Sequence, residues 1–284
     1  MALATDIGAV QDLARRVRRD IVQMLGAAGS GHPGGSLSAA DIVATLYGDV
    51  MRHDPDDPAM PTRDRFVLSK GHAAPVLYAT LAETGYFDRE HLGTLRRLGS
   101  MLQGHPDAKK TPGVEMSTGS LGQGLAIANG MALALRLDGN LDSTVFVLLG
   151  DGELQEGEVW EAAMFAAHQR LTNVVAIVDN NGLQIDGACD EVMSLGDIHS
   201  KFAAFGWDPV SCDGHDVGAL IDVLGSARSR ARGNGRPIVV VCTTTKGKGV
   251  SFMEGNADWH GKAPGTEQVA RALEELGAPE GDVS

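Results

Sequence analysis

Two continuous apolar runs lie near the middle of the chain, and each of them ends in polar residues and glycine. The first, residues 145–149, precedes Gly-Asp-Gly at 150–152, and the second, residues 174–178, precedes Asp-Asn-Asn-Gly at 179–182. Short apolar runs without alternation are typical of strands that are buried on both faces of a parallel sheet. Apolar residues at helical spacing from Leu154 to Gln169 predict a helix between the two strands. The segment is therefore predicted to be one βαβ unit.

The same pattern predicts helices and strands along the rest of the chain. Apolar positions from Ile7 to Met24 mark a first helix, whose arginines at 15, 16, 18 and 19 are expected to form a solvated face. Residues 31–36, rich in glycine, are expected to be a loop, with Ser38 as the N-cap of a helix through Leu46. Further strands are predicted at 66–69, up to Asp213 and at 238–243, further helices after His72, from Leu121, at 198–205, at 217–232 and from Glu267, and a long loop at 99–120. The alternation favours one α/β domain over residues 1–284, with a mostly parallel sheet and helices on both faces.

Polar residues that follow the two central strands are candidates for a metal site. Asp151 and Asn181 would lie at the same carboxyl edge of the sheet, where ligands collect in open α/β folds. A carboxylate and an amide oxygen suit Mg²⁺ or Ca²⁺, and the carbonyl of Leu183 is a candidate third ligand. Gly150 and Gly152 let the backbone approach phosphate closely. The pairing points to a metal-bound diphosphate and to thiamine diphosphate, although either half alone could be an ordinary turn.

Four of the nine histidines lie in loops bounded by glycine or proline: His32, His72, His105 and His260. Such loops belong at an exposed sheet rim, where imidazoles can bond diphosphate oxygens or exchange protons with sugar hydroxyls. For each histidine taken singly, a structural or surface role is the alternative.

Composition narrows the class of protein further. A formal net charge of −13 and a pI near 5.0 argue against nucleic acid or an anionic membrane as a partner. Cys189, Cys212 and Cys242 lack metal-ligand spacing and are expected to be reduced thiols. Residues 1–4 show no signal-peptide pattern and no apolar run is long enough to span a membrane, so a cytoplasmic location is expected. Neither a serine hydrolase elbow nor a nucleotide-binding loop is present.

These residues together resemble the N-terminal, diphosphate-binding part of transketolase. The matching motifs occur in order along nearly the whole chain: Ser-Gly-His-Pro-Gly at 30–34, Asp-Arg-Phe-Val-Leu-Ser-Lys-Gly-His at 64–72, Gly-Ser-Leu-Gly-Gln-Gly at 119–124, Gly-Asp-Gly at 150–152 with Asn181, and His-Gly-Lys-Ala-Pro at 260–264. The diphosphate motif alone is shared with decarboxylases and ketoacid dehydrogenases. The histidine loops narrow the resemblance to transketolase-like enzymes, with deoxyxylulose-phosphate synthase as the nearest competitor.

The resemblance implies a role for each matched residue. The metal ligands would be Asp151, Asn181 and the carbonyl of Leu183. The catalytic residues, which orient sugar hydroxyls and move protons, would be His32, His105 and His260. The residues that face thiamine diphosphate would be His72, Lys70, Gly119, Leu121, Gly122, Gly150, Gly152, Asn181 and Lys246. For Lys70 and Lys246 the alternative is a solvated loop lysine. Glu156 resembles a position near a subunit interface, with an ordinary first-turn glutamate as the alternative.

The implied reaction is the transfer of a two-carbon ketol unit from a ketose or its phosphate to an aldose, with the thiazolium as electron sink. A whole transketolase is more than twice as long as this chain. Its pyrimidine-binding and C-terminal domains are therefore expected on a complementary chain, in an α2β2 assembly. Three alternatives stay open: a similar enzyme that acts on an unusual ketose or a biosynthetic acyl donor, a non-catalytic assembly or regulatory module, and a truncated piece of a longer enzyme.

Overall fold

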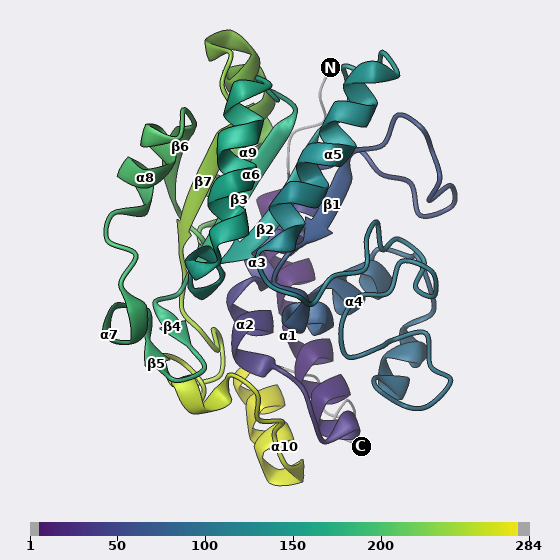
Figure 1. Ribbon diagram of the computed structural model, residues 1–284. Coiled ribbons are helices and arrows are strands. Elements are labelled where there is room, and N and C mark those ends of the chain that lie inside the picture. The colour runs from purple at the N-terminus through teal and green to yellow at the C-terminus, as the bar shows by residue number, and fades with distance from the viewer. Residues whose placement is uncertain (1–5, 278–284) are drawn as a thin grey trace.

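The computed structural model describes residues 6–277 and contains a five-stranded parallel sheet (Figure 1). The strands, in order across the sheet, are β1 (Arg65–Leu68), β2 (Val145–Gly150), β3 (Val174–Asn180), β7 (Ile238–Thr243) and β6 (Asp208–Asp213). All five coincide with strands predicted from the sequence, so the predicted class of parallel α/β sheet is confirmed. The short antiparallel hairpin β4 (Leu183–Gln184) and β5 (Gly187–Ala188) is an addition that the apolar pattern does not predict.

Helices bury both faces of the sheet against two separate hydrophobic cores. Alternate residues of one strand enter different cores, because successive side chains of a strand point to opposite faces. Phe146 and Leu148 enter the first core, and Val145, Val147 and Leu149 enter the second. The first core also contains residues of α1 (Ile7–Ala28), α3 (Ala40–Thr45), α4 (Ala74–Glu83) and α9 (Val217–Asn234), and the second contains residues of α5 (Gln123–Leu137), α6 (Gly157–His168) and α8 (Ile198–Ala204).

Shorter elements complete the chain around these layers. They are α2 (Pro33–Ser38), the π-helix η1 (Leu46–Val50), the 3₁₀ turns η2 (Gly71–Ala73), η3 (Arg89–Thr94), η4 (Gly152–Gln155) and η5 (Ala257–Trp259), and the helices α7 (Cys189–Met193) and α10 (Thr266–Glu275). Residues 99–120 contain neither helix nor strand, as predicted.

The winding of the sheet reverses between β3 and β7. Strands β1, β2 and β3 follow one another across the sheet, whereas β6 takes the far edge and the chain returns through α9 to place β7 beside β3. Ligands of open α/β sheets bind at such a switch point, outside the carboxyl ends of the strands. Asn180 and Thr243 are Cα partners there, directly before Asn181 and Thr244.

Two local predictions near the N-terminus are wrong. Pro33–Ser38 is the short helix α2 rather than a loop, with Pro33 in its first turn, where proline is tolerated because that N–H has no intrahelical acceptor. Ser38 does not cap the next helix. Its hydroxyl instead donates to the carbonyl of Gly35, at 3.2 Å, and to a carboxylate oxygen of Asp179, at 2.6 Å.

The helix between β2 and β3 and the arginines of α1 also differ from expectation. The connecting helix begins at Gly157, because the 3₁₀ turn η4 takes up the first residues of the predicted range. Arg18 is 8% exposed and forms a bidentate pair with Asp41, at 2.9 and 2.6 Å. The prediction of a solvated face is therefore wrong for Arg18.

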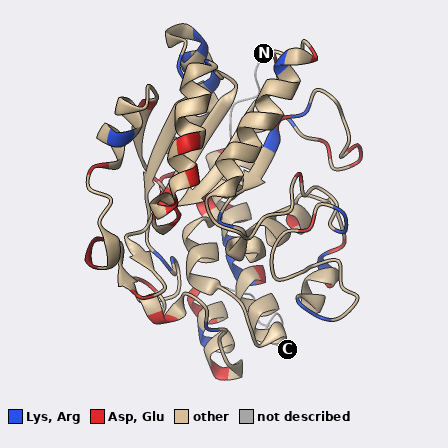
Figure 2. Cartoon of the chain, in the orientation of Figure 1, with Lys and Arg blue, Asp and Glu red and all other residues tan. Residues whose placement is uncertain are grey.

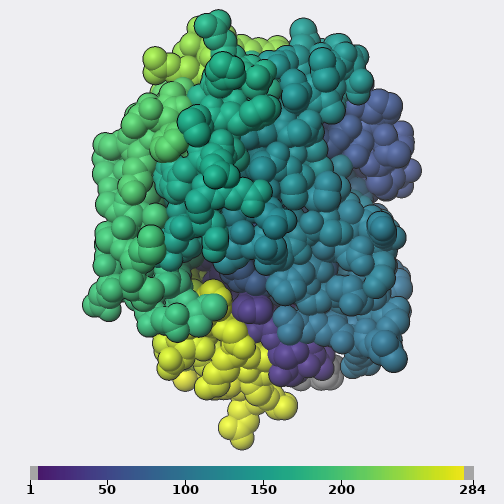
Figure 3. Space-filling model, viewed as in Figure 1, coloured from purple at the N-terminus to yellow at the C-terminus, as the bar shows by residue number. Residues whose placement is uncertain are grey.

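Charged residues lie mainly on helices and loops (Figure 2). In the space-filling view, the N-terminal and C-terminal parts of the chain meet at the bottom, where α10 packs on α1 (Figure 3). Between residues 6 and 277, no helix combines the length and the apolar character that crossing a membrane requires. Residues 1–4, which the signal-peptide argument concerns, lie outside the described range.

Candidate active site

A cavity of about 190 Å³ opens at the carboxyl edge of the sheet. Its walls come from the segments that follow β1, β2, β3 and β7. The predicted site residues among its walls are Lys70, His72, Leu121, Gly150, Asp151, Gly152, Asn181, Leu183, Lys246 and His260. Motifs that are far apart in the sequence thus meet at one place, which is the switch point of the sheet.

Asp151 is a buried carboxylate at the end of β2. Its two oxygens accept hydrogen bonds from the backbone N–H groups of Gly152, at 2.8 Å, and Gly182, at 2.5 Å. Burial, together with the nearby charge of Asp179, raises the pKa of Asp151 to about 6. A bound cation would oppose both effects, since a positive charge stabilises the ionised carboxylate.

Two neutral oxygens lie on the same wall as Asp151. The side-chain oxygen of Asn181 accepts from the N–H of Leu183 at 3.2 Å, and the carbonyl of Leu183 accepts from Lys246 Nζ at 3.0 Å. A carboxylate, an amide oxygen and a carbonyl are hard donors, so this set fits Mg²⁺ or Ca²⁺. In the described part of the chain, no group of three or more His, Cys, Asp or Glu side chains could hold a metal ion.

Both predicted site lysines are buried, so the solvated-loop alternative is wrong for them. Lys70 and Lys246 are each 2% exposed. Lys70 Nζ donates to the carbonyl of Gly35 at 2.8 Å and to the carboxylate of Asp179. Asp179 also accepts from Ser38 and Thr244, and its ion pair with Lys70 keeps its pKa below the usual range against the effect of burial. Asp179 was not among the predicted site residues. Its position at the end of an apolar strand was the one signal in the sequence that could have indicated its role.

Three of the four predicted histidines form one cluster. The ring centroids of His32, His72 and His260 lie 5.1 to 5.5 Å apart, and the rings of His72 and His260 are stacked. Burial is the main cause that lowers the pKa of His260 to about 3, that of His32 to about 4 and that of His72 well below its usual value. All three imidazoles are therefore neutral at pH 7.

Hydrogen bonding within the cluster leaves imidazole nitrogens for a ligand. Lys246 Nζ lies 2.9 Å from His260 Nδ1. Because an ammonium group can only donate, Nδ1 is the acceptor and the ring hydrogen is on Nε2. His32 Nδ1 is buried and has no hydrogen-bond partner among residues 6–277. A buried polar atom without a partner is costly, and this nitrogen is the unsatisfied atom of the cluster.

Four predicted residues are not part of the cavity wall: His32, His105, Gly119 and Gly122. His105 is exposed and packs on Gly119, where a Cβ atom would lie 2.9 Å from the imidazole. The N–H of Gly122 donates to Glu153 Oε1 at 2.9 Å. This N–H is thus used within the protein rather than pointed at a phosphate.

Glu153 and Arg96 are two residues near the site that the sequence did not single out. Glu153 is 3% exposed and accepts hydrogen bonds from Ser69, Gly122 and Gly150. It therefore ties the ends of β1 and β2 to the start of α5. In the sequence, nothing distinguishes Glu153 from an ordinary glutamate near the start of a helix, so its anchoring role could not be predicted.

Arg96 adopts φ of 62°, a left-handed conformation that is unfavourable for a residue with a side chain. Its guanidinium group lies 3.2 Å from a Cβ built at Gly104 and is near Gly31 as well. Both glycines precede a His-Pro pair, so Arg96 bridges the loops that carry His32 and His105. Its charge is, after burial, the next cause that lowers the pKa of both histidines.

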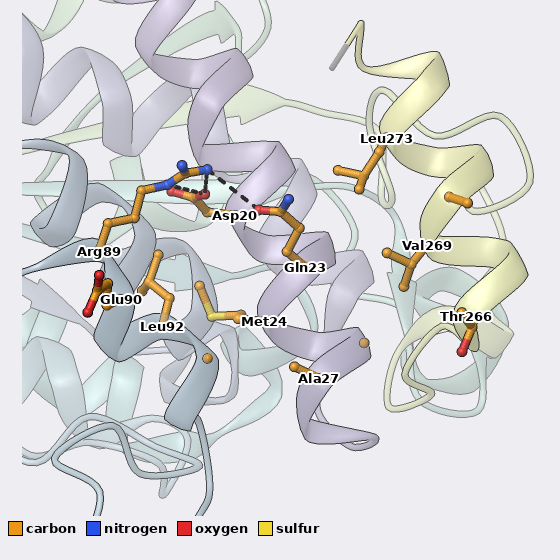
Figure 4. Close-up of a pocket in the computed structure, with 13 residues that line it drawn as sticks. Asp20, Gln23, Met24, Ala27, Arg89, Glu90, Leu92, Thr266, Val269 and Leu273 are labelled. Carbon is orange, nitrogen blue, oxygen red and sulfur yellow. Dashed lines mark hydrogen bonds and ion pairs between the residues drawn. The ribbon is translucent and has the colours of Figure 1, made fainter. Parts of the chain in front are cut away.

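A larger cavity, of about 700 Å³, lies elsewhere, between α1, η3 and α10 (Figure 4). Met24, Leu92, Val269 and Leu273 supply apolar side chains to it, and the ion pair of Asp20 and Arg89 lies at its edge. It contains none of the predicted site residues. The smaller cavity is the candidate active site because the convergent donors and histidines are there.

Comparison with known proteins agrees with this choice. Residues 9–282 match the family model described as "Transketolase, thiamine diphosphate binding domain". The chain is 44% identical to the 6-deoxy-6-sulfo-D-fructose transketolase subunit SqwG of Clostridium sp. (strain MSTE9), covering 94% of this chain and 96% of that protein. It is also 44% identical to one of the subunits of the apulose-4-phosphate transketolase of Phocaeicola vulgatus, covering 91% of this chain and 90% of that protein.

Whole-length transketolases match over the same region. Identity to human transketolase is 43%, over 94% of this chain and 42% of that protein. The crystal structure of transketolase from Campylobacter jejuni superposes with a TM-score of 0.87 at 34% identity, covering 98% of this chain and 45% of that one. The chain thus spans less than half the length of these transketolases.

The fold and the cavity define a thiamine-diphosphate-binding α/β domain. The match over residues 9–282 shows the family of the chain. The chain belongs to the transketolase family. It is a transferase of the transketolase type.

Proposed function

We propose that this chain is the diphosphate-binding subunit of a two-chain transketolase, which transfers a two-carbon ketol unit from a ketose to an aldose. The observation that carries the proposal is the convergence of Asp151, Asn181, Lys246, His72 and His260 on one cavity. Relatives matched over nine tenths or more of their length are named as transketolase subunits, which supports the two-chain arrangement.

Thiamine diphosphate would be held by its diphosphate at the carboxyl ends of β2, β3 and β7. Asp151, Asn181 and the Leu183 carbonyl would bind Mg²⁺ or Ca²⁺, and Lys246 would leave that carbonyl for a phosphate oxygen. Gly150 and Gly152 would let the backbone approach the diphosphate. When bound, the cofactor would supply a nucleophilic thiazolium carbon and a ring that takes up the electron pair of the broken carbon–carbon bond.

The histidines of this chain would handle the protons of the sugar. A neutral imidazole has one nitrogen that accepts a proton and one that donates a hydrogen bond, and the low pKa values of His32 and His260 keep both rings neutral at pH 7. Nε2–H of His260 would donate to a substrate oxygen, and the imidazole of His32, which packs edge-on against that of His260, would help to orient a sugar hydroxyl. His105, which is more exposed, would contact the sugar farther from the cofactor.

A complementary chain would complete the site. Large apolar side chains are exposed close to the cavity, with Leu121 at 36% and Ile185 at 68%. On α6, Met164 and Phe165 are exposed as well, at 57% and 41%. Exposed apolar groups around a site favour an interface, so we place the pyrimidine-binding and C-terminal domains on a partner that covers them. An α2β2 assembly, with this chain as a single domain, follows the preference of oligomers for closed symmetry.

The donor is proposed to be a ketose with an anionic terminal group. Two relatives are named for apulose 4-phosphate and for 6-deoxy-6-sulfo-D-fructose, which carry a phosphate and a sulfonate. We also propose that the enzyme acts in the cytoplasm, where such sugars are metabolised. A purely structural role is not favoured, since every predicted metal donor and catalytic histidine is present.

The test is reconstitution with candidate partner chains. The chain is copurified with each candidate, and two-carbon transfer is measured with thiamine diphosphate, Mg²⁺ and a panel of phosphorylated, sulfonated and neutral ketoses. The proposal predicts transfer by the pair and none by either chain alone. Full activity of this chain alone would refute the two-chain arrangement, and transfer only from donors other than sugars would refute the proposed donor class. His260→Ala should remove most of the transfer, with the exposed His91→Ala as the matched control.

A further inference from the structure

Two cysteines lie side by side on neighbouring strands, near the carboxyl edge of the sheet. Cys212 of β6 and Cys242 of β7 are Cα partners, and both are free cysteines of the same hydrophobic core. Paired residues of adjacent strands point to the same face, and the strands lie about 4.8 Å apart. This spacing is within the range of about 4.4–6.8 Å that disulfide-bonded Cα atoms show.

The two thiols have unequal surroundings. Cys212 is 8% exposed and lines an open cavity of about 580 Å³ together with His215 and Lys248, whereas Cys242 is fully buried. The thiol of Cys212 donates to the carbonyl of Asp213 at 3.4 Å. The neighbouring thiol of Cys242 lowers the pKa of Cys212, whereas the pKa of Cys242 is raised. A thiol of lowered pKa at the edge of an open cavity, beside a second thiol that is fully buried, resembles the arrangement of an oxidisable pair.

We propose that Cys212 and Cys242 are a site of reversible oxidation, at which hydrogen peroxide converts the two thiols into a cross-strand disulfide. The thiolate of Cys212 attacks one peroxide oxygen, so that an S–O bond forms, the O–O bond breaks, and the leaving hydroxide takes up a proton as water. The sulfur of Cys242 then attacks the sulfur of Cys212. The S–S bond forms, the S–O bond breaks, and the two thiol protons and the peroxide end in two molecules of water.

A disulfide here is readily reversible for a geometric reason. Disulfides prefer Cβ atoms about 3.8 Å apart, and in-register neighbours of a parallel sheet must approach each other to reach that separation. Strained disulfides have higher reduction potentials and are reduced more easily than structural ones. A dithiol reductant therefore restores both thiols.

The position of the pair connects it to the cavity. Cys242 has Cys212 as its Cα partner on one side and Asp179 on the other. Two residues farther along, Thr244 donates to the carboxylate of Asp179, which holds Lys70. A new bond at Cys242 thus forms one strand away from the hydrogen-bond network beneath the candidate active site.

The experiment uses the full chain alone and does not depend on its activity. Hydrogen peroxide is added in small molar excess, the remaining thiols are alkylated, and intact mass and peptide mapping identify the products. We expect the loss of two of the three alkylatable thiols, a peptide that links Cys212 to Cys242, and recovery of both thiols with dithiothreitol. Oxidation that spares this pair, or that joins Cys189 to either partner, would overturn the proposal.

Single variants separate the two steps. Cys242→Ser should stop at a sulfenic acid on Cys212 that dimedone traps, and Cys212→Ser should leave Cys242 unmodified under the same conditions. Cys189→Ser is the matched control and should form the disulfide as the unmodified chain does. If Cys212→Ser were oxidised at Cys242 as fast as the unmodified chain, the assigned order of attack would be wrong.

Discussion

Lys70 and Asp179 form a buried ion pair beneath the candidate active site, and the carboxylate of Asp179 joins four separate segments of the chain. It accepts hydrogen bonds from Ser38 of α2, Lys70 after β1, Asn181 after β3 and Thr244 after β7. The segments that carry the cofactor-binding groups are thus linked through one carboxylate. Lys70 is a part of this network, so its ammonium group helps to hold the wall of the cavity in place.

Removal of the charge at Asp179 should destabilise the fold. Asp179→Asn leaves the buried ammonium of Lys70 without a counter-charge, which costs on the order of 3–5 kcal/mol in comparable buried pairs. The free energy of unfolding, measured by urea denaturation, checks this expectation. Asp12→Asn, which breaks an exposed pair with Arg15, should change it by less than about 1 kcal/mol. Equal effects of the two substitutions would contradict the structural role of Asp179.

The low pKa values of His32 and His260 predict a loss of stability in weak acid. The unfolded chain takes up a proton at each imidazole near pH 6.5, whereas the folded protein keeps them neutral until about pH 4 at His32 and about pH 3 at His260. Their contribution is therefore complete above pH 6.5 and is lost as the pH falls toward 4, by on the order of 2 kcal/mol per histidine.

Imidazole NMR titration of the metal-free chain measures these values directly. Both rings should stay neutral at pH 5, and the free energy of unfolding should fall between pH 6.5 and 4.5. Protonation of both rings near pH 6.5 would contradict the buried, mutually close arrangement of the cluster.

Gly71 allows close contact between two loops of the site. A Cβ atom there would lie 2.7 Å from the backbone nitrogen of Gly119, so Gly71→Ala must push these loops apart. Overpacking of this kind costs about 1–3 kcal/mol. Gly225→Ala in α9, where nothing lies within 4 Å of the added carbon, should instead stabilise the chain by about 0.5–1 kcal/mol. Thermal and urea denaturation of both variants test the contrast, and a neutral Gly71→Ala would refute the close approach.

Glu153 should be intolerant even of an isosteric change. Its carboxylate accepts from the N–H groups of Gly122 and Gly150, and a glutamine would turn an NH₂ group toward one of these donors. A buried N–H left without an acceptor costs about 1–3 kcal/mol. Glu158→Gln on the exposed surface of α6 is the control, for which a change within about 0.5 kcal/mol is expected. If both substitutions gave the same urea midpoint, Glu153 would have no anchoring role.

The strands and the meeting point of the motifs could be predicted from the sequence because both depend on local patterns. The runs at 145–149 and 174–178 are apolar enough to identify buried strands, and parallel strands place their carboxyl ends at one edge. The proposed metal donors Asp151 and Asn181 were placed at one edge of the sheet by that geometry, and both line the same cavity. The three clustered histidines followed from their loops and from the resemblance to transketolase.

Features that depend on contacts between distant segments could not be predicted in this way. Residues 33–38 contain two glycines, which argue against a helix, yet α2 forms because all six of its residues are buried by tertiary packing. Arg18 looked like part of a solvated run, and only the fold shows its pair with Asp41. Asp179 and Glu153 have ordinary sequence positions, and their anchoring roles arise from partners that lie far away in the chain.

The central claim is that Asp151 helps to bind a divalent cation and, through it, thiamine diphosphate. The most direct measurement is the affinity of the reconstituted pair for thiamine diphosphate, with and without Mg²⁺, for the unmodified chain and for Asp151→Asn. Changes near a metal site commonly cost 10–100-fold in affinity, so the loss of a direct ligand should weaken Mg²⁺-dependent binding by about 100-fold or more. Asp190→Asn, at an exposed position close by, should bind as the unmodified chain does. Binding that is independent of Mg²⁺, or unchanged in Asp151→Asn, would contradict the account.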